Sequence, residues 1–282
     1  MKIKIGFIAD FFDHDLIGGA ELNDGVLIRY LKEYCEINTC KSNLVTSDFI
    51  ENNDKFIVSN FIGLQDNVKK HLERKNYIIY EHDHKYLISR DPSRFKNFQI
   101  PEEQKINQSF YKKAAKIVVL SKICKNILVQ NNISNNVVSI GCSIWPDSAL
   151  DFISSIQNTE KKYKFAVVNS QNSIKGTKQA LQFCKQRNID PHLIGSSKYE
   201  DFLSQLAECE NLIFFPQVLE TFSRLASEAK MLNCNLVTNP KMLGFASEEY
   251  LHLKGSELVE KIRDQKNKAL KLFEQWCENE LL

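Results

Sequence analysis

Two glutamates in the second half of the chain have a spacing suited to binding a phosphorylated ligand. Glu220 and Glu228 are separated by seven residues in the run Leu219–Ala229, shortly after the apolar stretch Leu212–Phe215. The pattern places Glu220 in a loop ahead of a helix and Glu228 about two turns inside that helix. The free N–H groups and the positive end of the helix dipole between them would form an anion site. An acid at each end of a phosphate cradle suits a nucleotide-sugar, although glutamates at this spacing also occur on solvated helix faces.

Two further turns carry residues that suit a phosphate. Lys175-Gly176 follows the apolar stretch Phe165–Val168 and a polar loop, where a lysine could act on a phosphate as a point charge. Gly18-Gly19 precedes a helical pattern and would let backbone N–H groups approach a ligand. An exposed lysine and a flexible glycine loop are the alternatives. The glycines do not form G-x-G-x-x-G, and no acid is placed to bind a ribose, which disfavours a dinucleotide-dependent oxidoreductase or epimerase.

Histidine and aspartate gather at two other places. His82 and His84 follow the apolar stretch Tyr77–Tyr80, and in an extended strand they would project to one face, with Asp83 on the other. Such a face could bind a metal or touch a substrate, but the sequence offers no third ligand. Asp13-His14-Asp15 resembles a D-x-D metal clip, for which a solvated loop is the preferred interpretation. We therefore expect neither a metal nor a cofactor.

The elements that must position these residues alternate between strand and helix patterns. Strands are predicted over Lys2–Ile8, Phe56–Ser59, Tyr77–Tyr80, Ile117–Leu120 and Val137–Ile140, and in a second series over Phe165–Val168, His192–Ile194, Leu212–Phe215 and Leu236–Thr238. Helices are predicted near Gly19–Tyr34, Lys105–Ala114, Lys122–Gln130, Lys175–Arg187, Tyr199–Leu206, Ser223–Met231 and Glu257–Trp276. This alternation indicates parallel sheets with helical crossovers.

The two series predict an α/β fold with two Rossmann-like, doubly wound domains. We expect the domains over residues 1–146 and 160–255, followed by a C-terminal helix over 256–282. The connecting segment Asp147–Lys162 is polar and irregular except for an amphipathic piece around Phe152–Ile156. Two such domains facing each other would form a central cleft lined by the carboxyl ends of strands, where ligands bind in these sheets.

Composition excludes several classes of protein. The chain has 282 residues, of which 43% are hydrophobic and 26% charged, as in ordinary globular proteins. Its 37 basic and 35 acidic residues give a net charge of +2, whereas a bulk polyanion binder would be far more basic. There is no run of 18 apolar residues, so no transmembrane helix is expected. The apolar N-terminus is interrupted by Asp10 and is not expected to be a signal peptide, so the eight cysteines, which include no CxxC pair, indicate reduced thiols in a cytoplasmic protein.

Four motifs together resemble the retaining glycosyltransferases of the two-domain GT-B fold, specifically family 4 (glycosyl transferases group 1). Gly18-Gly19-Ala20-Glu21 is similar to the glycine motif of the family's first loop, and Tyr80-Glu81-His82-Asp83 to its histidine at a strand end. Lys175-Gly176 matches the family's K-G, and Leu219–Ala229 matches its E-x7-E, "E-G-F-G-L-x-x-x-E-A". Besides these four motifs, the segment Ala114–Ser121 is similar to the family's "A-D-x-V-I-x-x-S".

The resemblance implies a transfer of sugar from a nucleotide-sugar, which is a substrate and not a cofactor, with retention of configuration and without metal. It implies that His82 lies at the reacting sugar and that Glu220 contacts hydroxyls of the donor sugar. Glu228 would accept both ribose hydroxyls. The diphosphate and sugar would be held by Lys175 and by N–H groups at Gly18, Gly19, Phe222, Ser223 and Arg224.

The chain departs from the family pattern at three places. The arginine that usually precedes the K-G lysine is absent from Asn169-Ser170-Gln171-Asn172, so either Arg224 replaces it or diphosphate binding is weaker. "N-G-V-D" is replaced by Ile140-Gly141-Cys142-Ser143, and "E-G-F-G" by Glu220-Thr221-Phe222-Ser223. These departures motivate the alternative of a non-catalytic protein of the same fold that binds a nucleotide-sugar or a partner protein.

The acceptor is not identified by the sequence. The stretch Lys85–Lys125 carries ten basic and three acidic residues, with aromatic residues between them. Such a stretch could attract anionic lipid headgroups, an acidic glycan or nucleic acid. The acceptor could accordingly be a glycan, a lipid-linked sugar or another anionic molecule, with peripheral contact at the inner face of a membrane. Solvated helix faces around an ordinary core are the alternative.

Overall fold

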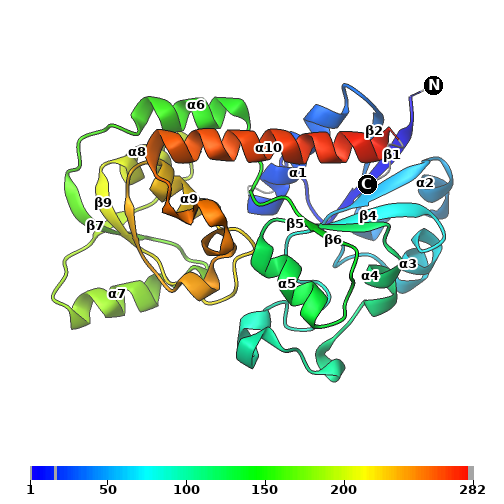
Figure 1. Cartoon of the computed structure of the whole chain (residues 1–282), viewed down its shortest axis with the longest axis horizontal. Helices are drawn as coiled ribbons and strands as arrows, with labels where there is room; N and C mark the ends of the chain where they lie inside the picture. The colour runs from blue at the N-terminus through cyan, green and yellow to red at the C-terminus, as the bar shows by residue number, and fades with distance from the viewer. Residues whose placement is uncertain (1, 16–17, 279–282) are drawn as a thin grey trace. The chain divides into compact units, whose positions relative to one another are not determined.

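The computed structural model describes residues 2–15 and 18–278, and they divide into two compact units. Unit 1 comprises the described residues up to Trp145 together with those from Gln265 onward, and unit 2 comprises Pro146–Asp264. Each unit is built on its own sheet, in which every pair of neighbouring strands is parallel (Figure 1). The predicted fold class, two Rossmann-like α/β domains, is confirmed.

The sheet of unit 1 has a single reversal of strand order. Its strands are β1 (Lys4–Ala9), β2 (Glu36–Lys41), β3 (Lys55–Val58), β4 (Asn76–Glu81), β5 (Lys116–Val119) and β6 (Val137–Ser139), and its helices include α1 (Gly19–Leu31), α2 (Ser47–Glu51), α3 (Asp66–Leu72), α4 (Gln108–Lys113) and α5 (Lys122–Gln130). Within the described residues the strand order is β2-β1-β3-β4-β5-β6. The chain therefore goes from β1 to β2 on one side and crosses to β3 on the other. Ligands of such sheets bind at this switch point, beside the carboxyl ends of β1 and β3.

Unit 2 repeats the arrangement on a smaller scale. It contains α6 (Asp147–Ile156), β7 (Tyr163–Val168), α7 (Thr177–Gln186), β8 (His192–Ile194), α8 (Tyr199–Ala207), β9 (Cys209–Ile213), α9 (Arg224–Met231) and β10 (Asn235–Val237). In the part of the chain that is described, the strand order is β10-β9-β7-β8. The switch point therefore lies between β7 and β9, at the loops that carry Lys175 and Glu220.

The long helix α10 (Gly255–Cys277) begins in unit 2 and ends in unit 1 (Figure 1). In unit 1 its Phe273 ring packs edge-on against Tyr80 of β4 at 5.0 Å. The buried Lys55 ammonium donates hydrogen bonds to the carbonyl oxygens of Trp276 at 2.6 Å and Cys277 at 3.2 Å. A cation is stabilising there because the last carbonyls of a helix have no intrahelical partner and carry partial negative charge. Residues 279–282 of the predicted C-terminal segment lie outside the described residues.

Three local predictions need correction. Segment 147–162 is irregular only over 157–162, because the amphipathic piece expected around Phe152–Ile156 extends back to Asp147 as α6. Leu150 and Ile153 of this helix are fully buried, and on its polar side Arg263 holds Asp147 at 2.6 Å and Asp151 at 2.7 Å. Strand β2 was not predicted, since its sequence EINTCK is half exposed and lacks an apolar run. The helix predicted over 105–114 is only α4, which begins at Gln108 after Asn107 adopts a positive φ.

Candidate functional site

Lys175 and Glu220 meet at the switch point of unit 2. Lys175 ends the 3₁₀ turn Ser173–Lys175 after β7, and Glu220 lies in the loop after β9. Their Nζ and Oε1 atoms are 2.7 Å apart. The Lys175 side chain is 38% exposed and that of Glu220 12%, so the pair lies at the surface with the acid the more covered. The topology thus joins a cation and a carboxylate that are 45 positions apart in the sequence.

Backbone hydrogen bonds hold the two loops together. The N–H of Gln217 donates to the carbonyl of Ile174 at 2.8 Å, which ties the loop after β9 to the loop after β7. Glu220 donates its N–H to Met242 at 3.0 Å, and its carbonyl accepts the N–H of Gly244 at 2.8 Å. The Glu220 backbone is therefore fixed on both sides, and its carboxylate is held by the ion pair with Lys175.

Gly176 is required by its conformation and by its neighbour. It has a φ of +70°, and a Cβ added there would collide with the carbonyl oxygen of Phe215. We expect Gly176→Ala to lower the free energy of unfolding by roughly 2 kcal/mol or more, from strain and overpacking combined. Urea denaturation followed by circular dichroism measures this. Gly195→Ala is the matched control, because its Cβ would come no closer than 3.5 Å to Asn169; equal losses in the two variants would contradict the prediction.

The amino end of α9 has the character of an anion site. Ser223 is the N-cap of α9 and has a φ of +80°, which is the left-handed region that favours the glycine of the family pattern. Its buried hydroxyl has no hydrogen-bond partner within residues 2–15 and 18–278. The first N–H groups of a helix lack intrahelical acceptors. The Phe222 side chain packs on Phe245 at 5.5 Å in the core, so Phe222 can offer a ligand only its backbone.

Glu228 lies in α9, where it is 3% exposed. The hydroxyl of Tyr199, at the start of α8, donates to Glu228 Oε1 at 2.6 Å. Arg224 Nε lies 3.6 Å from the same oxygen. The six residues predicted in the second half of the chain therefore lie on the loops after β7 and β9 and on α9. Tyr199 was missed, because nothing in its local sequence distinguishes it from any aromatic residue in a first helical turn.

Gly18 and Gly19 form the start of α1 in unit 1, with Gly18 as the N-cap and Gly19 exposed. A Cβ on Gly18 would collide with the carboxylate of Glu21, so this glycine makes room for that side chain. Burial raises the pKa of the Glu21 carboxyl.

His82 is held by a buried aspartate. Its Nε2 lies 3.2 Å from Asp24 Oδ1, and the side chains of the two residues are 3% and 1% exposed. Asp24 Oδ2 accepts a hydrogen bond from the Ser59 hydroxyl at 2.6 Å. Asp24 comes from α1, whereas Ser59 and His82 directly follow β3 and β4, so the three meet at the carboxyl edge of the sheet. The sequence did not reveal Asp24 or Ser59 as partners, because their proximity depends on strand order.

The predicted common face of His82 and His84 is wrong. Strand β4 ends at Glu81, and His84 has a φ of +54°, so the chain is not extended through these residues. His84 Nδ1 lies 2.8 Å from the Tyr86 hydroxyl, whereas His82 contacts Asp24. The two imidazoles therefore have different partners and do not form a joint ligand set.

A buried network fixes the turn that carries His82. Glu81 Oε1 accepts hydrogen bonds from Lys85 Nζ at 2.8 Å and from the Asp83 N–H at 2.7 Å, and the Tyr111 hydroxyl donates to Glu81 Oε2. Burial alone would raise the pKa of Glu81, but the Lys85 ammonium and these hydrogen bonds lower it to about 2. Glu81 therefore stays ionised near neutral pH and holds the turn by charge-assisted hydrogen bonds.

The first loop of unit 1 uses its carboxylates in ion pairs. Asp13 Oδ2 lies 2.7 Å from Arg29 Nη1, and Asp15 Oδ1 lies 2.7 Å from Lys41 Nζ. Among the residues that the structure describes, no group of three histidine, cysteine, aspartate or glutamate side chains is placed to hold a metal ion.

The basic stretch Lys85–Lys125 carries less free charge than its composition suggests. Ion pairs within 4 Å join Lys85 to Glu81, Arg90 to Asp83, Arg94 to Asp91, Lys105 to Glu102 and Lys113 to Glu73. Lys85 is also 3% exposed. The pairing weakens the attraction that this stretch could exert on an anionic acceptor.

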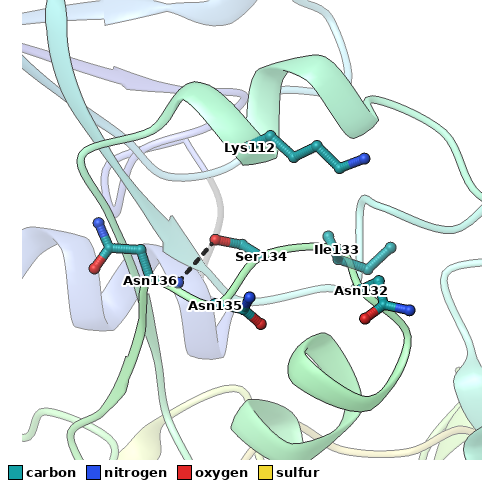
Figure 2. Close-up of a pocket in the computed structure, with 6 residues that line it drawn as sticks. All are labelled: Lys112, Asn132, Ile133, Ser134, Asn135 and Asn136. Atoms are coloured by element: carbon teal, nitrogen blue, oxygen red, sulfur yellow. Dashed lines mark hydrogen bonds between the residues drawn. The ribbon is translucent and has the colours of Figure 1, made fainter.

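A surface pocket of about 380 Å³ lies away from these residues. Figure 2 shows its lining, which is Lys112 of α4 and the loop Asn132–Asn136 that leads into β6. The loop is stiffened by a 3.1 Å hydrogen bond from the Asn136 N–H to Ser134 Oγ (Figure 2). Because this loop precedes its strand, the pocket lies at the amino edge of the sheet and contains none of the predicted site residues.

Comparison with known proteins identifies the fold. No family model and no curated protein sequence matches the chain. Among solved structures, Anabaena Alr3699/HepE in complex with UDP and glucose matches with a TM-score of 0.50 and 13% identity, over 99% of this chain and 93% of that chain. The Methanocaldococcus jannaschii UDP-GlcNAc 2-epimerase in complex with UDP-GlcNAc and UDP gives a TM-score of 0.46 and 12% identity, over 95% of this chain and 93% of that one. The match to HepE shows the fold, which is of the GT-B class.

None of the helices within residues 2–15 and 18–278 is both long and apolar enough to cross a membrane.

Proposed function

We propose that the chain is a glycosyltransferase that moves a sugar from a nucleoside-diphosphate sugar to an acceptor, with retention of configuration as in family 4. The observation that carries the proposal is the grouping at the switch point of unit 2. Lys175 and Glu220 lie on the loops after the neighbouring strands β7 and β9 and form an ion pair there. The second loop leads into α9, whose N-cap hydroxyl, that of Ser223, has no partner among the described residues. The E-x7-E spacing adds Glu228 to the same helix.

Each residue of this group has a role in the proposal. Lys175 and the N–H groups at the start of α9 bind the diphosphate and stabilise the charge that develops on it as the sugar leaves. Fixed cations and amide dipoles can do this without reorganisation during the reaction. Glu220 accepts hydrogen bonds from hydroxyls of the donor sugar, and Glu228 from the ribose, since an ionised carboxylate has two acceptor oxygens.

The arginine that usually precedes the K-G lysine is absent, and Lys175 and the N–H groups at the start of α9 bind the diphosphate in its place. Arg224 Nε lies 3.6 Å from Glu228, which places its guanidinium beside the acid assigned to the ribose. Arg224 therefore contributes to the donor site through its N–H and its contact with Glu228.

Glu228→Ala is expected to weaken nucleotide binding by about 1.5–3 kcal/mol, the range for hydrogen bonds to a charged group. The reason is the loss of a carboxylate that accepts two ribose hydroxyls. Calorimetry with UDP and GDP measures the change. Glu210→Ala, which alters an exposed residue of β9, is the control; unchanged affinity in Glu228→Ala would remove Glu228 from the site.

Turnover is expected to persist without added divalent metal, because Lys175 and the start of α9 would supply the positive charge. The measurement is transfer or donor hydrolysis in EDTA, with Mn²⁺ added back. A loss in EDTA that Mn²⁺ restores would contradict the prediction and direct attention to Asp13 and Asp15 as ligands.

Donor hydrolysis tests the proposed function directly. The protein is incubated with UDP-, GDP-, ADP- and dTDP-sugars, and the free nucleotide is measured. UDP-glucose is the first to test, because HepE was solved with UDP and glucose. Release of one nucleotide above the rate of a Lys175→Met variant supports an enzyme. Binding without release supports the alternative, a non-catalytic nucleotide-sugar-binding protein.

A further inference from the structure

The contact between Tyr199 and Glu228 has a geometry that controls how Glu228 can act. Tyr199 is the first residue of α8, directly after the loop that follows β8, and Glu228 lies one helical turn beyond Arg224 in α9. The phenol hydroxyl is 2.6 Å from Glu228 Oε1. This distance is typical of a hydroxyl donating to an ionised carboxylate. Burial and the Glu228 charge raise the pKa of Tyr199, so its hydroxyl keeps the proton that it donates.

We propose that Tyr199 is a positioning residue for nucleoside recognition: its hydroxyl holds Glu228 in the orientation that accepts the vicinal hydroxyls of a ribose. The inference rests on the proposed function and adds to it a residue that selects ribonucleoside diphosphates over those without ribose hydroxyls.

Tyr199 and Arg224 restrain the orientation of the Glu228 carboxylate in different ways. A glutamate side chain has three rotatable bonds, and an isolated carboxylate would sample several orientations. Arg224 is on the same helix one turn away, so its 3.6 Å contact restrains Glu228 mainly along α9. Tyr199 approaches from a different helix and binds one carboxylate oxygen from there. Ordering the carboxylate before the ligand arrives lowers the entropy cost of binding.

The test compares a ribonucleotide with its dideoxy counterpart. The affinities of UDP and 2′,3′-dideoxyuridine 5′-diphosphate are measured by calorimetry for the wild type, Tyr199→Phe, Glu228→Gln and the double variant. Tyr199→Phe keeps the ring and removes the hydroxyl, and is expected to weaken UDP binding about tenfold. Dideoxy-UDP is expected to bind the wild type and Tyr199→Phe equally. In the double variant the tyrosine change is expected to add nothing for UDP, because the two residues act as a unit.

Controls separate positioning from mere support of the fold. Tyr163→Phe alters a tyrosine of β7 that stacks on His192 at 3.6 Å, and is expected to leave both affinities unchanged. An equal loss for UDP and dideoxy-UDP in Tyr199→Phe would overturn the inference and indicate a structural role. No loss in Tyr199→Phe beside a clear loss in Glu228→Gln would also overturn it while leaving the proposed function intact. A wild type that binds none of UDP, GDP, ADP and dTDP would overturn the proposed function and this inference together.

Discussion

Lys175→Met is expected to lower kcat/KM for sugar transfer by about 10²–10³-fold, the usual cost of removing one fixed group that stabilises charge in a transition state. The lysine lies at the switch point of unit 2, 2.7 Å from Glu220, and its side chain is 38% exposed, so a diphosphate can reach it. Methionine keeps the apolar stem and removes the charge. The measurement is steady-state kinetics with the donor identified by the panel of nucleotide-sugars.

One control for this prediction alters a nearby lysine, and the other changes Lys175 itself in a different way. Lys178→Met alters an exposed lysine of α7 and is expected to leave kcat/KM unchanged. Lys175→Arg keeps the charge with a different geometry and is expected to recover part of the activity. Equal activity in Lys175→Met and Lys178→Met would show that the diphosphate charge is stabilised elsewhere. Because Lys175 is paired with Glu220, the diphosphate of a donor must compete with that carboxylate for the lysine.

His82→Ala is expected to lower turnover by about 10²-fold, the cost of misplacing a reacting group, while nucleotide affinity stays unchanged. The reason is a division of contacts: the side chains assigned to the nucleotide, Lys175 and Glu228, belong to unit 2. In unit 1 only the backbone at Gly18 and Gly19 is assigned to the diphosphate, and His82 is assigned to the reacting sugar. Turnover and the Kd of the nucleotide are measured on the same preparation.

His71→Ala provides the control in unit 1. His71 of α3 lies 2.7 Å from the carboxylate of Glu51 and is not part of the candidate site, so turnover should not change in His71→Ala. If nucleotide affinity in His82→Ala fell as far as kcat/KM, the assignment of His82 to the sugar alone would be wrong. Because His82 is buried against Asp24, circular dichroism must first show that the variant is folded.

The fold was predictable because its signals are local. Short β-branched runs such as Ile117–Leu120 and amphipathic runs such as Lys122–Gln130 correspond to β5 and α5 within a residue or so. Strand β2 has no apolar run and forms because β1 offers it a parallel partner from Lys4 to Ala9. A half-exposed strand without an apolar run depends on the neighbouring strand for its formation, so its own sequence does not predict it.

The candidate site was predictable only in part, for a related reason. The motifs along the chain indicated Lys175, Glu220 and Glu228, which lie on the loops after β7 and β9 and on α9. Their partners come from other elements: Tyr199 is 29 positions from Glu228, and Asp24 is 58 from His82. Such contacts follow from strand order and helix packing, which hydrophobic periodicity does not specify. Hydrophobic periodicity likewise gave no sign that β4 ends at Glu81 or that His84 adopts a positive φ, which together remove the expected common face of His82 and His84.

The sharing of α10 between the units has a consequence for synthesis on the ribosome. Unit 2 is continuous from Pro146 to Asp264, so every residue it needs has been translated once Asp264 has emerged. Unit 1 starts first, yet its sheet lacks Phe273, and Lys55 lacks its carbonyl acceptors, until α10 has emerged as far as Cys277. While unit 2 is being translated, β1 to β6 have therefore already been made, but Tyr80 of β4 is not yet covered by Phe273. The domain that is translated first is thus the one completed last.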